Sequence, residues 1–174
     1  MKWMDLILVG ITLTVFFITH NSVLFWIMLI GTCAYCLYTR IKTNNEAIER
    51  GEIIKRDIKY FTQRHKFFTS ISDINILWNS VDKSVLKKYG VKVAFGENKI
   101  YFKVSDTTAL LSMYLEENKK IYEFRVIEYR SSKYGVSGFM ETNVILTDIE
   151  KTILRLDPEA KIERLHNPMK TKLF

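Results

Sequence analysis

The sequence predicts an α+β protein in two parts: an apolar helical hairpin at the N-terminus and, after it, a domain built on a mainly antiparallel sheet flanked by helices. Two observations predict this division. Residues 6–39 contain no charged side chain, whereas residues 41–174 carry 24 Lys and Arg, of 26 in the whole chain, against 18 Asp and Glu, of 19. Beyond residue 90 the apolar pattern has a period of two, which is typical of strands. A chain of 174 residues has room for one domain beside a membrane element.

Residues 1–40 contain two apolar stretches that predict a transmembrane hairpin. The spans cover about residues 4–19 and 23–39, and the polar residues His20, Asn21 and Ser22 separate them. At about 1.5 Å per residue, each helix falls slightly short of the roughly 30 Å hydrocarbon core, so we expect flanking residues to contribute. One continuous helix is too long and would place the polar triplet deep in lipid, which favours the hairpin.

The distribution of Lys and Arg predicts how the hairpin is oriented. Lys2 precedes the first span, several cations follow the second, and the short loop between the spans has none. The positive-inside rule therefore places both termini in the cytoplasm. A signal peptide over residues 1–19 is the alternative, but it lacks a small-x-small cleavage pattern and a second apolar run follows at once. The cations after the second span are Arg40, Lys42, Arg50, Lys55 and Arg56.

Small side chains mark a seam along the two spans. Gly10 and Thr14 have small-x-x-x-small spacing, as do Thr32 and Cys36, and such pairs let helices approach closely. The same side chains also suit the polar lining of a pore in an oligomer, and both interpretations stay open. Cys33 and Cys36 form a C-x-x-C motif, which elsewhere indicates redox or metal chemistry. Inside an apolar run with no neighbouring His or third Cys, helix packing is the better interpretation.

A juxtamembrane connecting helix is predicted over residues 41–69. Its apolar positions are spaced by alternating steps of four and three, a heptad pattern sustained for three repeats. We expect this seam either to pack on the protein's own core or to form a short oligomerisation stalk. His65 is interpreted as a packing residue. The seam consists of Ala47, Gly51, Ile54, Ile58, Phe61, His65 and Phe68.

Residues 70–174 are predicted to form a soluble α+β domain. The segment Ser70–Asp73 indicates an N-cap, and one amphipathic helix is expected after it, with Lys87 and Lys88 in its last turn and Gly90 just beyond its end. The period then changes to two, which predicts two hairpins. They consist of residues 91–95 with 100–104 and of residues 109–115 with 121–129.

A loop, a helix and one further strand complete the predicted domain. Residues 130–138 are rich in Ser, Gly and basic side chains, which is typical of an exposed loop. The segment Thr147–Glu150 has the pattern of a capping box, so a helix is expected from Thr147 to about Leu156. Residues 161–165 are expected to form the last strand. The order α-β-β-β-β-α-β predicts an antiparallel sheet with helices before and after it.

The sequence contains no recognisable catalytic or metal-binding motif. It has no H-E-x-x-H, P-loop or G-x-S-x-G pattern, and His65 and His166 are the only histidines after the spans. We therefore expect a protein that is not an enzyme and needs no cofactor. The positive surplus over residues 41–174 favours an anionic partner, which is a lipid head group, a nucleic acid or a small phosphorylated ligand.

The loop after the second hairpin is the predicted ligand site. Arg130, Ser131, Ser132, Lys133 and Tyr134 combine two cations, two hydroxyls and an aromatic ring, beside two glycines. Such a loop offers backbone N–H groups and charge to a phosphate, and its tyrosine offers a surface on which a base can stack. The same composition also describes an ordinary exposed loop, so both interpretations stay open.

The plan of the chain resembles that of the membrane effectors of bacterial nucleotide-signalling phage defence, which have two N-terminal membrane helices and a small, basic, strand-containing cytoplasmic domain. One branch is the type III CRISPR-associated membrane effector, whose soluble domain senses a cyclic oligoadenylate and which oligomerises. Another branch has a β-barrel domain, and the helical content of this chain is closer to the first. The resemblance covers the overall plan from Met1 to Phe174 and includes no residue-level motif.

The resemblance implies a two-pass homo-oligomer in the bacterial inner membrane that binds a cyclic oligonucleotide and alters membrane integrity in antiviral defence. Arg130 and Lys133 would lie against the phosphates. A ligand bound across subunits would rearrange the hairpins by its higher affinity for one arrangement of the subunits. No duplex DNA is expected as a partner. The alternative is a non-enzymatic, membrane-tethered immunity or scaffold protein that binds a protein partner.

Overall fold

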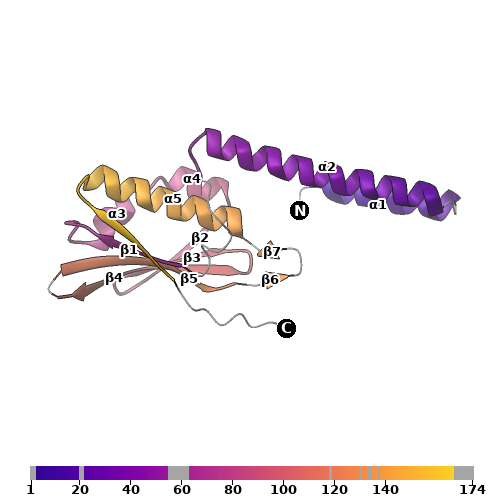
Figure 1. Ribbon diagram of the computed structural model, residues 1–174. Helices are drawn as coiled ribbons and strands as arrows, with labels where there is room; N and C mark the ends of the chain where they lie inside the picture. The colour runs from indigo at the N-terminus through magenta and orange to yellow at the C-terminus, as the bar shows by residue number, and fades with distance from the viewer. Residues whose placement is uncertain are drawn as a thin grey trace. The chain divides into compact units, whose positions relative to one another are not determined.

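The computed structural model describes residues 3–19, 22–54, 63–117, 119–129, 131–132, 135–136 and 138–166. The chain divides into two compact units, Met1–Glu49 and Arg50–Phe174. The first unit is helical and the second contains the sheet (Figure 1).

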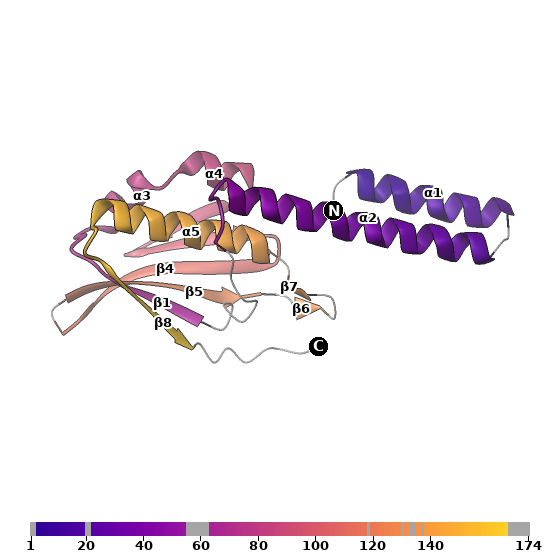
Figure 2. The same cartoon turned by 45° about the horizontal axis from the view of Figure 1, so that its top comes forward.

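The first unit consists of two helices, α1 (Trp3–Thr19) and α2 (Ser22–Glu49). They run in opposite directions along each other (Figure 2), and the hydroxyl oxygens of Thr12 and Thr32 lie 3.2 Å apart across their contact. Apolar side chains remain uncovered on both helices: Phe17, Ile18 and Ile30 are 68%, 74% and 66% exposed. Among the described residues, α2 is the one helix long and apolar enough to cross a membrane.

The second unit is built on a six-stranded sheet with the spatial order β2-β3-β4-β5-β1-β8. Every neighbouring pair of strands is antiparallel, so the predicted α+β class with an antiparallel sheet is confirmed for this unit. Two shorter strands pair with each other outside this sheet. The strands are β1 (Gln63–Phe68), β2 (Lys92–Gly96), β3 (Lys99–Val104), β4 (Thr107–Glu116), β5 (Lys119–Glu128), β6 (Ser131–Ser132), β7 (Gly135–Val136) and β8 (Lys161–His166).

Three helices of the second unit lie on one face of the sheet: α3 (Ile74–Ser80), α4 (Lys83–Lys88) and α5 (Phe139–Leu156) (Figures 1 and 2). Apolar side chains from both layers form one core between them. Complete burial of such a side chain contributes about 1.5–3 kcal/mol, so this layer holds the helices on the sheet. Its fully buried members include Phe67, Ile100, Phe102, Leu111, Tyr122 and Phe124 from strands and Leu77, Ile145, Leu146 and Ile149 from helices.

Local backbone signals place the turns and caps of the domain. Asp73 caps α3 by accepting a hydrogen bond from Asn75 N at 2.8 Å. Asn98 has a φ of 51° in the turn between β2 and β3, a left-handed conformation that Asn tolerates. Gly90, with a φ of 67°, follows α4. The predicted cap, the position of this glycine and both predicted hairpins are confirmed.

The single helix predicted after Asp73 is instead two short helices. α3 ends at Ser80, and Asp82 starts α4 by accepting hydrogen bonds from the Ser84 backbone N at 3.0 Å and hydroxyl at 2.6 Å. Between them Val81 has an extended backbone and a buried side chain. A second N-cap inside one apolar pattern therefore restarts the helix in a new direction.

The connecting helix predicted over residues 41–69 is wrong beyond Glu49 wherever the structure describes the chain. α2 ends at Glu49, Gly51 adopts a left-handed φ of 67°, and residues 52–54 are not helical. Residues 63–68 form strand β1, an interior strand of the sheet that lies between β5 and the edge strand β8. The predicted seam positions Ile58 and Phe61 lie outside the described residues.

The alternation within β1 explains this error. His65 and Phe67 point into the core, where they are 1% and 0% exposed, while Arg64 and Lys66 lie on the opposite face. His65 Nδ1 lies 3.6 Å from Glu150 Oε1 on α5. A heptad pattern that uses positions 65 and 68 draws from both faces of this strand, so helical spacing matched residues that do not share a surface.

The helix predicted from Thr147 begins eight residues earlier. α5 starts at Phe139 after Gly138, which has a φ of 72°. Thr147 is 1% exposed in the middle of α5, and its hydroxyl donates to Asn143 Oδ1 at 3.1 Å. The apparent capping box is wrong because this threonine uses its hydroxyl for a contact inside the fold.

Candidate functional site

The sheet face that no described helix of the second unit covers presents charged and aromatic side chains. The strand register places Tyr101, Leu110, Arg125 and Arg64 in one row across β3, β4, β5 and β1. Arg125 and Arg64 are therefore directly opposite each other. Like charges in opposite positions on adjacent strands are destabilising, so this pair requires a counter-charge or a bound anion.

Glu123 supplies one counter-charge to this arginine pair. Its side chain is only 6% exposed, and it accepts hydrogen bonds from Arg64 Nη2 at 2.9 Å and from the Tyr114 hydroxyl at 3.1 Å. Arg125 Nε lies 3.7 Å from the other carboxylate oxygen. One carboxylate thus faces two guanidinium groups, and the three side chains together carry a net positive charge.

The two arginines keep hydrogen-bonding capacity. Within the described part of the chain, the Nε atoms of Arg64 and Arg125 are buried and have no hydrogen-bond partner, although each guanidinium has five N–H donors. The side chains as a whole are 33% and 42% exposed. A guanidinium fork matches the oxygens of phosphate and carboxylate. An anion seated over this row can therefore engage the exposed N–H groups of both arginines, although their buried Nε atoms are out of its reach.

Lys66 and Tyr114 extend the charged surface beyond the arginine row. Lys66 Nζ donates to Glu116 Oε2 at 2.8 Å and lies 5.8 Å from the centre of the Tyr114 ring. The hydrogen bond with Glu116 raises the pKa of Lys66, and burial raises the pKa of Tyr114. At neutral pH this part of the face therefore presents an ammonium group beside a neutral phenol.

Cations outnumber carboxylates over the whole uncovered face, which we call the basic face. Tyr101 and Tyr114 lie among these charges. Cationic side chains interleaved with aromatic rings suit a ligand that combines phosphates with planar bases. The cations are Arg64, Lys66, Lys92, Lys99, Lys103, Lys119, Arg125 and Lys161, and the carboxylates are Glu116, Glu123, Glu128 and Glu163.

The structure describes part of the ligand loop predicted from the sequence. Ser131 and Ser132 form β6 and pair with Val136 and Gly135 of β7. The other predicted contacts, Arg130, Lys133 and Tyr134, lie outside the described residues. The loop site therefore stays a prediction.

The predicted small-residue seam is divided between the helix contact and the exposed surface. Thr32 meets Thr12 between α1 and α2, and Cys36 is half-buried. Gly10 and Thr14 are exposed, and the Thr14 hydroxyl donates to Gly10 O at 2.8 Å. A Cβ added at Gly10 would meet nothing within 4 Å. Gly10 and Thr14 are thus available to a partner surface rather than used between the two helices.

Sequence reasoning missed the basic face because its members come from distant segments. The heptad spacing predicts a helix at Arg64, whereas this residue pairs with Arg125 of β5 across 60 residues of chain. The available signal was the alternation Arg64-His65-Lys66-Phe67, which puts both cations on one side of a strand. Only the register of β1 against β5 shows that Glu123 lies beside them.

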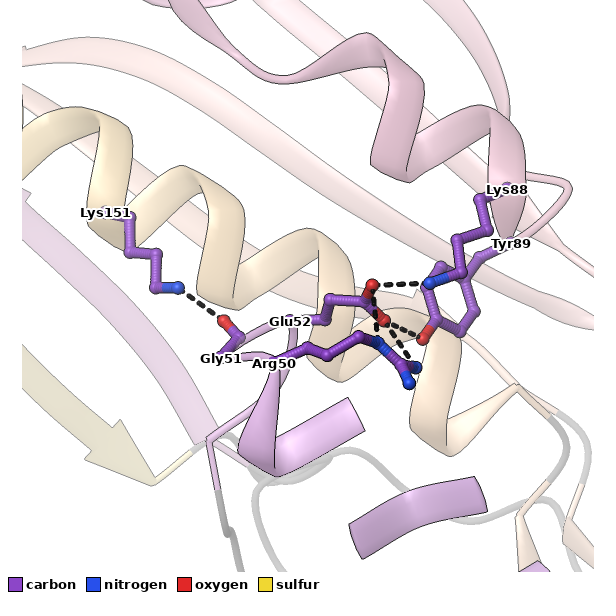
Figure 3. Close-up of polar contacts among 6 residues, drawn as sticks. All are labelled: Arg50, Gly51, Glu52, Lys88, Tyr89 and Lys151. Atoms are coloured by element: carbon purple, nitrogen blue, oxygen red, sulfur yellow. Dashed lines mark hydrogen bonds and ion pairs between the residues drawn. The ribbon is translucent and has the colours of Figure 1, made fainter. Parts of the chain in front are cut away.

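A second polar cluster holds the segment that follows α2. Glu52 receives hydrogen bonds from Arg50 Nε at 3.1 Å, Arg50 Nη2 at 3.2 Å, the Tyr89 hydroxyl at 2.5 Å and Lys88 Nζ (Figure 3). These contacts, those of Arg50 first, lower the pKa of Glu52 to about 2. Lys151 of α5 donates to Gly51 O in the same view. Glu52 is therefore ionised throughout the physiological range.

A cavity of about 410 Å³ adjoins this cluster, between residues 50–52, the end of α3 and α5. Cations and carboxylates balance on its walls. Arg155 donates to Ser80 O at 2.5 Å, and Asp148 accepts from the Asp82 backbone N at 3.1 Å. Burial raises the pKa of Asp148 to about 6. Its charged lining residues are Arg50, Glu52, Asp82, Asp148, Lys151 and Arg155.

Comparison with known proteins leaves the geometry as the basis for a functional proposal. No family model, curated protein or solved structure matches this chain. Across the residues with described positions, no three His, Cys, Asp or Glu side chains are placed to hold a metal ion. The basic face is therefore the candidate site that the described geometry defines best.

Proposed function

We propose that this protein is a membrane-anchored effector whose cytoplasmic domain binds a cyclic oligonucleotide on its basic face and alters membrane integrity in antiviral defence. One observation carries the ligand class: Arg64 and Arg125 lie directly opposite each other, with a single buried carboxylate, Glu123, between two guanidinium groups. A phosphate diester supplies the missing negative charge.

The exposed apolar surface of α1 and α2 supports the membrane anchor. Phe17, Ile18 and Ile30 are about two-thirds exposed, an arrangement that is costly in water and favourable in lipid. Threonine hydroxyls within these helices bond to helical carbonyls, as Thr14 does to Gly10 O, so few polar groups are left facing hydrocarbon. We propose an inner-membrane hairpin with both termini in the cytoplasm, oriented by the cations after α2.

The neighbours of the arginine pair support a nucleotide over a simple anion. Tyr101 lies in the same row, and Tyr114 bonds to Glu123. A base stacked on an exposed aromatic side chain contributes about 1–3 kcal/mol. Each phosphate contact with a cation adds an electrostatic term that weakens as salt increases.

Calorimetric titration of the full-length protein in detergent with a panel of cyclic oligoadenylates tests the ligand. Arg125→Gln is expected to weaken binding at least ten-fold, because charge-assisted hydrogen bonds are worth about 1.5–3 kcal/mol. Lys87→Gln is the matched control, since Lys87 is an exposed cation in the last turn of α4, on the helical layer. Equal effects of the two substitutions, or no heat with any member of the panel, would overturn the proposal.

Dye release from vesicles that contain the full-length protein tests the effect on the membrane. The proposal expects release only when the cyclic oligonucleotide is present, and less release with Arg125→Gln at a subsaturating concentration. Release that is independent of the ligand would separate the membrane activity from the basic face.

A membrane-tethered scaffold that binds a protein partner is the second candidate. It is favoured by the aromatic pair Trp78 and Phe95, whose ring centres lie 5.4 Å apart and of which Phe95 is 59% exposed on the edge strand β2. Exposed aromatic side chains are frequent anchors of protein interfaces. Phe95→Asp is expected to abolish recovery of a partner in a pull-down under this alternative and to leave oligonucleotide binding intact.

A further inference from the structure

We propose that residues 50–54 form a releasable latch that fastens the chain leaving α2 onto α5, with Glu52 as its locking residue. Arg50 directly follows the last residue of α2. The state of these five residues therefore decides how much free chain separates α2 from the folded domain. The latch does not depend on which ligand the domain binds. Only an effect of its release on the membrane rests on the proposed function.

The latch lies along one side of α5. Asn143 Nδ2 donates to Ile54 O at 2.7 Å, the Ile54 N–H donates to Thr147 Oγ1 at 3.3 Å, and Lys151 donates to Gly51 O. Asn143, Thr147 and Lys151 are spaced by four, so they share one face of the helix. These three side chains thus bond to the C=O groups of Gly51 and Ile54 and to the N–H group of Ile54, which lie outside any helix or strand.

Glu52 closes the latch on its other side. Its carboxylate joins Arg50 within the latch to Lys88 and Tyr89 at the end of α4 (Figure 3). Ile53, beside it, is 3% exposed and is the buried apolar side chain of the segment. The latch therefore joins α4 to α5, because Glu52 bonds to Lys88 and Tyr89 while the backbone of Gly51 and Ile54 bonds to α5.

The composition of these contacts makes the latch weaker than the core it rests on. Apart from Ile53, the contacts are polar. Asn143 and Thr147 are buried, whereas two of the side chains that bond to Glu52 face solvent: Arg50 is 45% and Lys88 49% exposed. Gly51 adopts a left-handed φ of 67°, a conformation that a glycine takes at little cost. Segments held by few apolar contacts open at lower free energy than core strands.

Hydrogen exchange of the full-length protein in detergent, measured by mass spectrometry without any ligand, tests the latch. Glu52→Gln is expected to accelerate exchange of the peptide that contains residues 51–54 roughly ten- to hundred-fold, since three charge-assisted contacts weaken. Exchange of β4 and β5 is expected to stay within two-fold. Lys151→Met, which removes the bond to Gly51 O from an exposed position, is expected to have a smaller effect in the same direction.

Glu97→Gln is the matched control, because Glu97 is an exposed carboxylate in the turn between β2 and β3. It is expected to leave exchange of residues 51–54 unchanged. An unchanged exchange rate of residues 51–54 in both latch variants would overturn the proposal. Equal acceleration of residues 51–54 and of β4 and β5 would also overturn it, because the latch would then open only when the whole domain unfolds. Because no ligand or vesicle is used, these outcomes are separate from failure of the proposed function.

Discussion

Glu123 is the position at which domain stability and anion binding are expected to change in opposite directions. The substitution Glu123→Gln preserves the shape of the side chain and one carbonyl acceptor, but it removes the charge that faces Arg64 and Arg125. The apo domain then holds two opposed guanidinium groups with no counter-charge. A bound phosphate, by contrast, no longer meets a carboxylate.

The structure sets the size of both effects. The Glu123 side chain is 6% exposed, and its bonds from Arg64 at 2.9 Å and from Tyr114 at 3.1 Å weaken with a neutral acceptor. Hydrogen bonds to charged groups contribute about 1.5–3 kcal/mol, so a loss of about 2 kcal/mol in the free energy of unfolding is expected. A carboxylate at ~8 Å repels a phosphate by about 1–2 kcal/mol at an effective dielectric constant of about 20–40, so affinity rises several-fold.

Pulse proteolysis in urea and calorimetric titration of the full-length protein measure the two effects. With an m-value of about 2 kcal/mol/M, the midpoint of Glu123→Gln is expected to fall by about 1 M. Glu163→Gln is the matched control, since Glu163 is an exposed carboxylate on the same face in register with Lys66, and its midpoint is expected to shift by less than about 0.3 M. A Glu123→Gln protein that is as stable as the parent, or that binds the oligonucleotide more weakly, would refute this account of the arginine pair.

Three further substitutions test other parts of the structure. Leu77→Ala empties a completely buried position of α3 and is expected to cost about 3 kcal/mol, measured as a lower urea midpoint. On the proposed membrane anchor, Ile30→Lys places a charge on the exposed apolar surface of α2, near the middle of the span 23–39. It is expected to shift the protein from the membrane to the soluble fraction on centrifugation, since such a charge costs about 3 kcal/mol at a helix centre. Burial raises the pKa of Asp148 to about 6, so the stabilisation by its protonated form is complete below about pH 4 and is lost as the pH rises through 6. In thermal unfolding, the free energy of unfolding of Asp148→Asn is expected to exceed that of the parent by about 1–2 kcal/mol at pH 8 and to match it at pH 3.

Features determined by neighbouring residues were predictable from the sequence. Asp73 caps the helix that follows it, Asn98 turns the first hairpin and Gly90 follows the helix that carries two lysines in its last turn. Each depends on a conformational preference of one residue or on a hydrogen bond over two or three positions. The alternation that predicted β2 to β5 is likewise a local pattern.

Features determined by distant contacts were not predictable from the sequence. β1 is a strand because β5 and β8 lie on either side of it, and its six residues have no turn signal of their own. Thr147 resembles a helix cap until Asn143 and Ile54 are placed beside it. The arginine pair likewise appears only when the register of two strands is known.

The place of β1 between β5 and β8 also constrains the order in which this sheet can form during synthesis. β1 is made early, but one of its partners, β5, begins more than 50 residues later, and the other, β8, ends at His166. The six-stranded sheet therefore cannot be completed until the chain up to His166 has left the ribosome. Contacts of such long sequence separation also form slowly. The apolar helices α1 and α2 precede the domain in the chain, so their exposed apolar side chains leave the ribosome while the domain behind them is still unfolded.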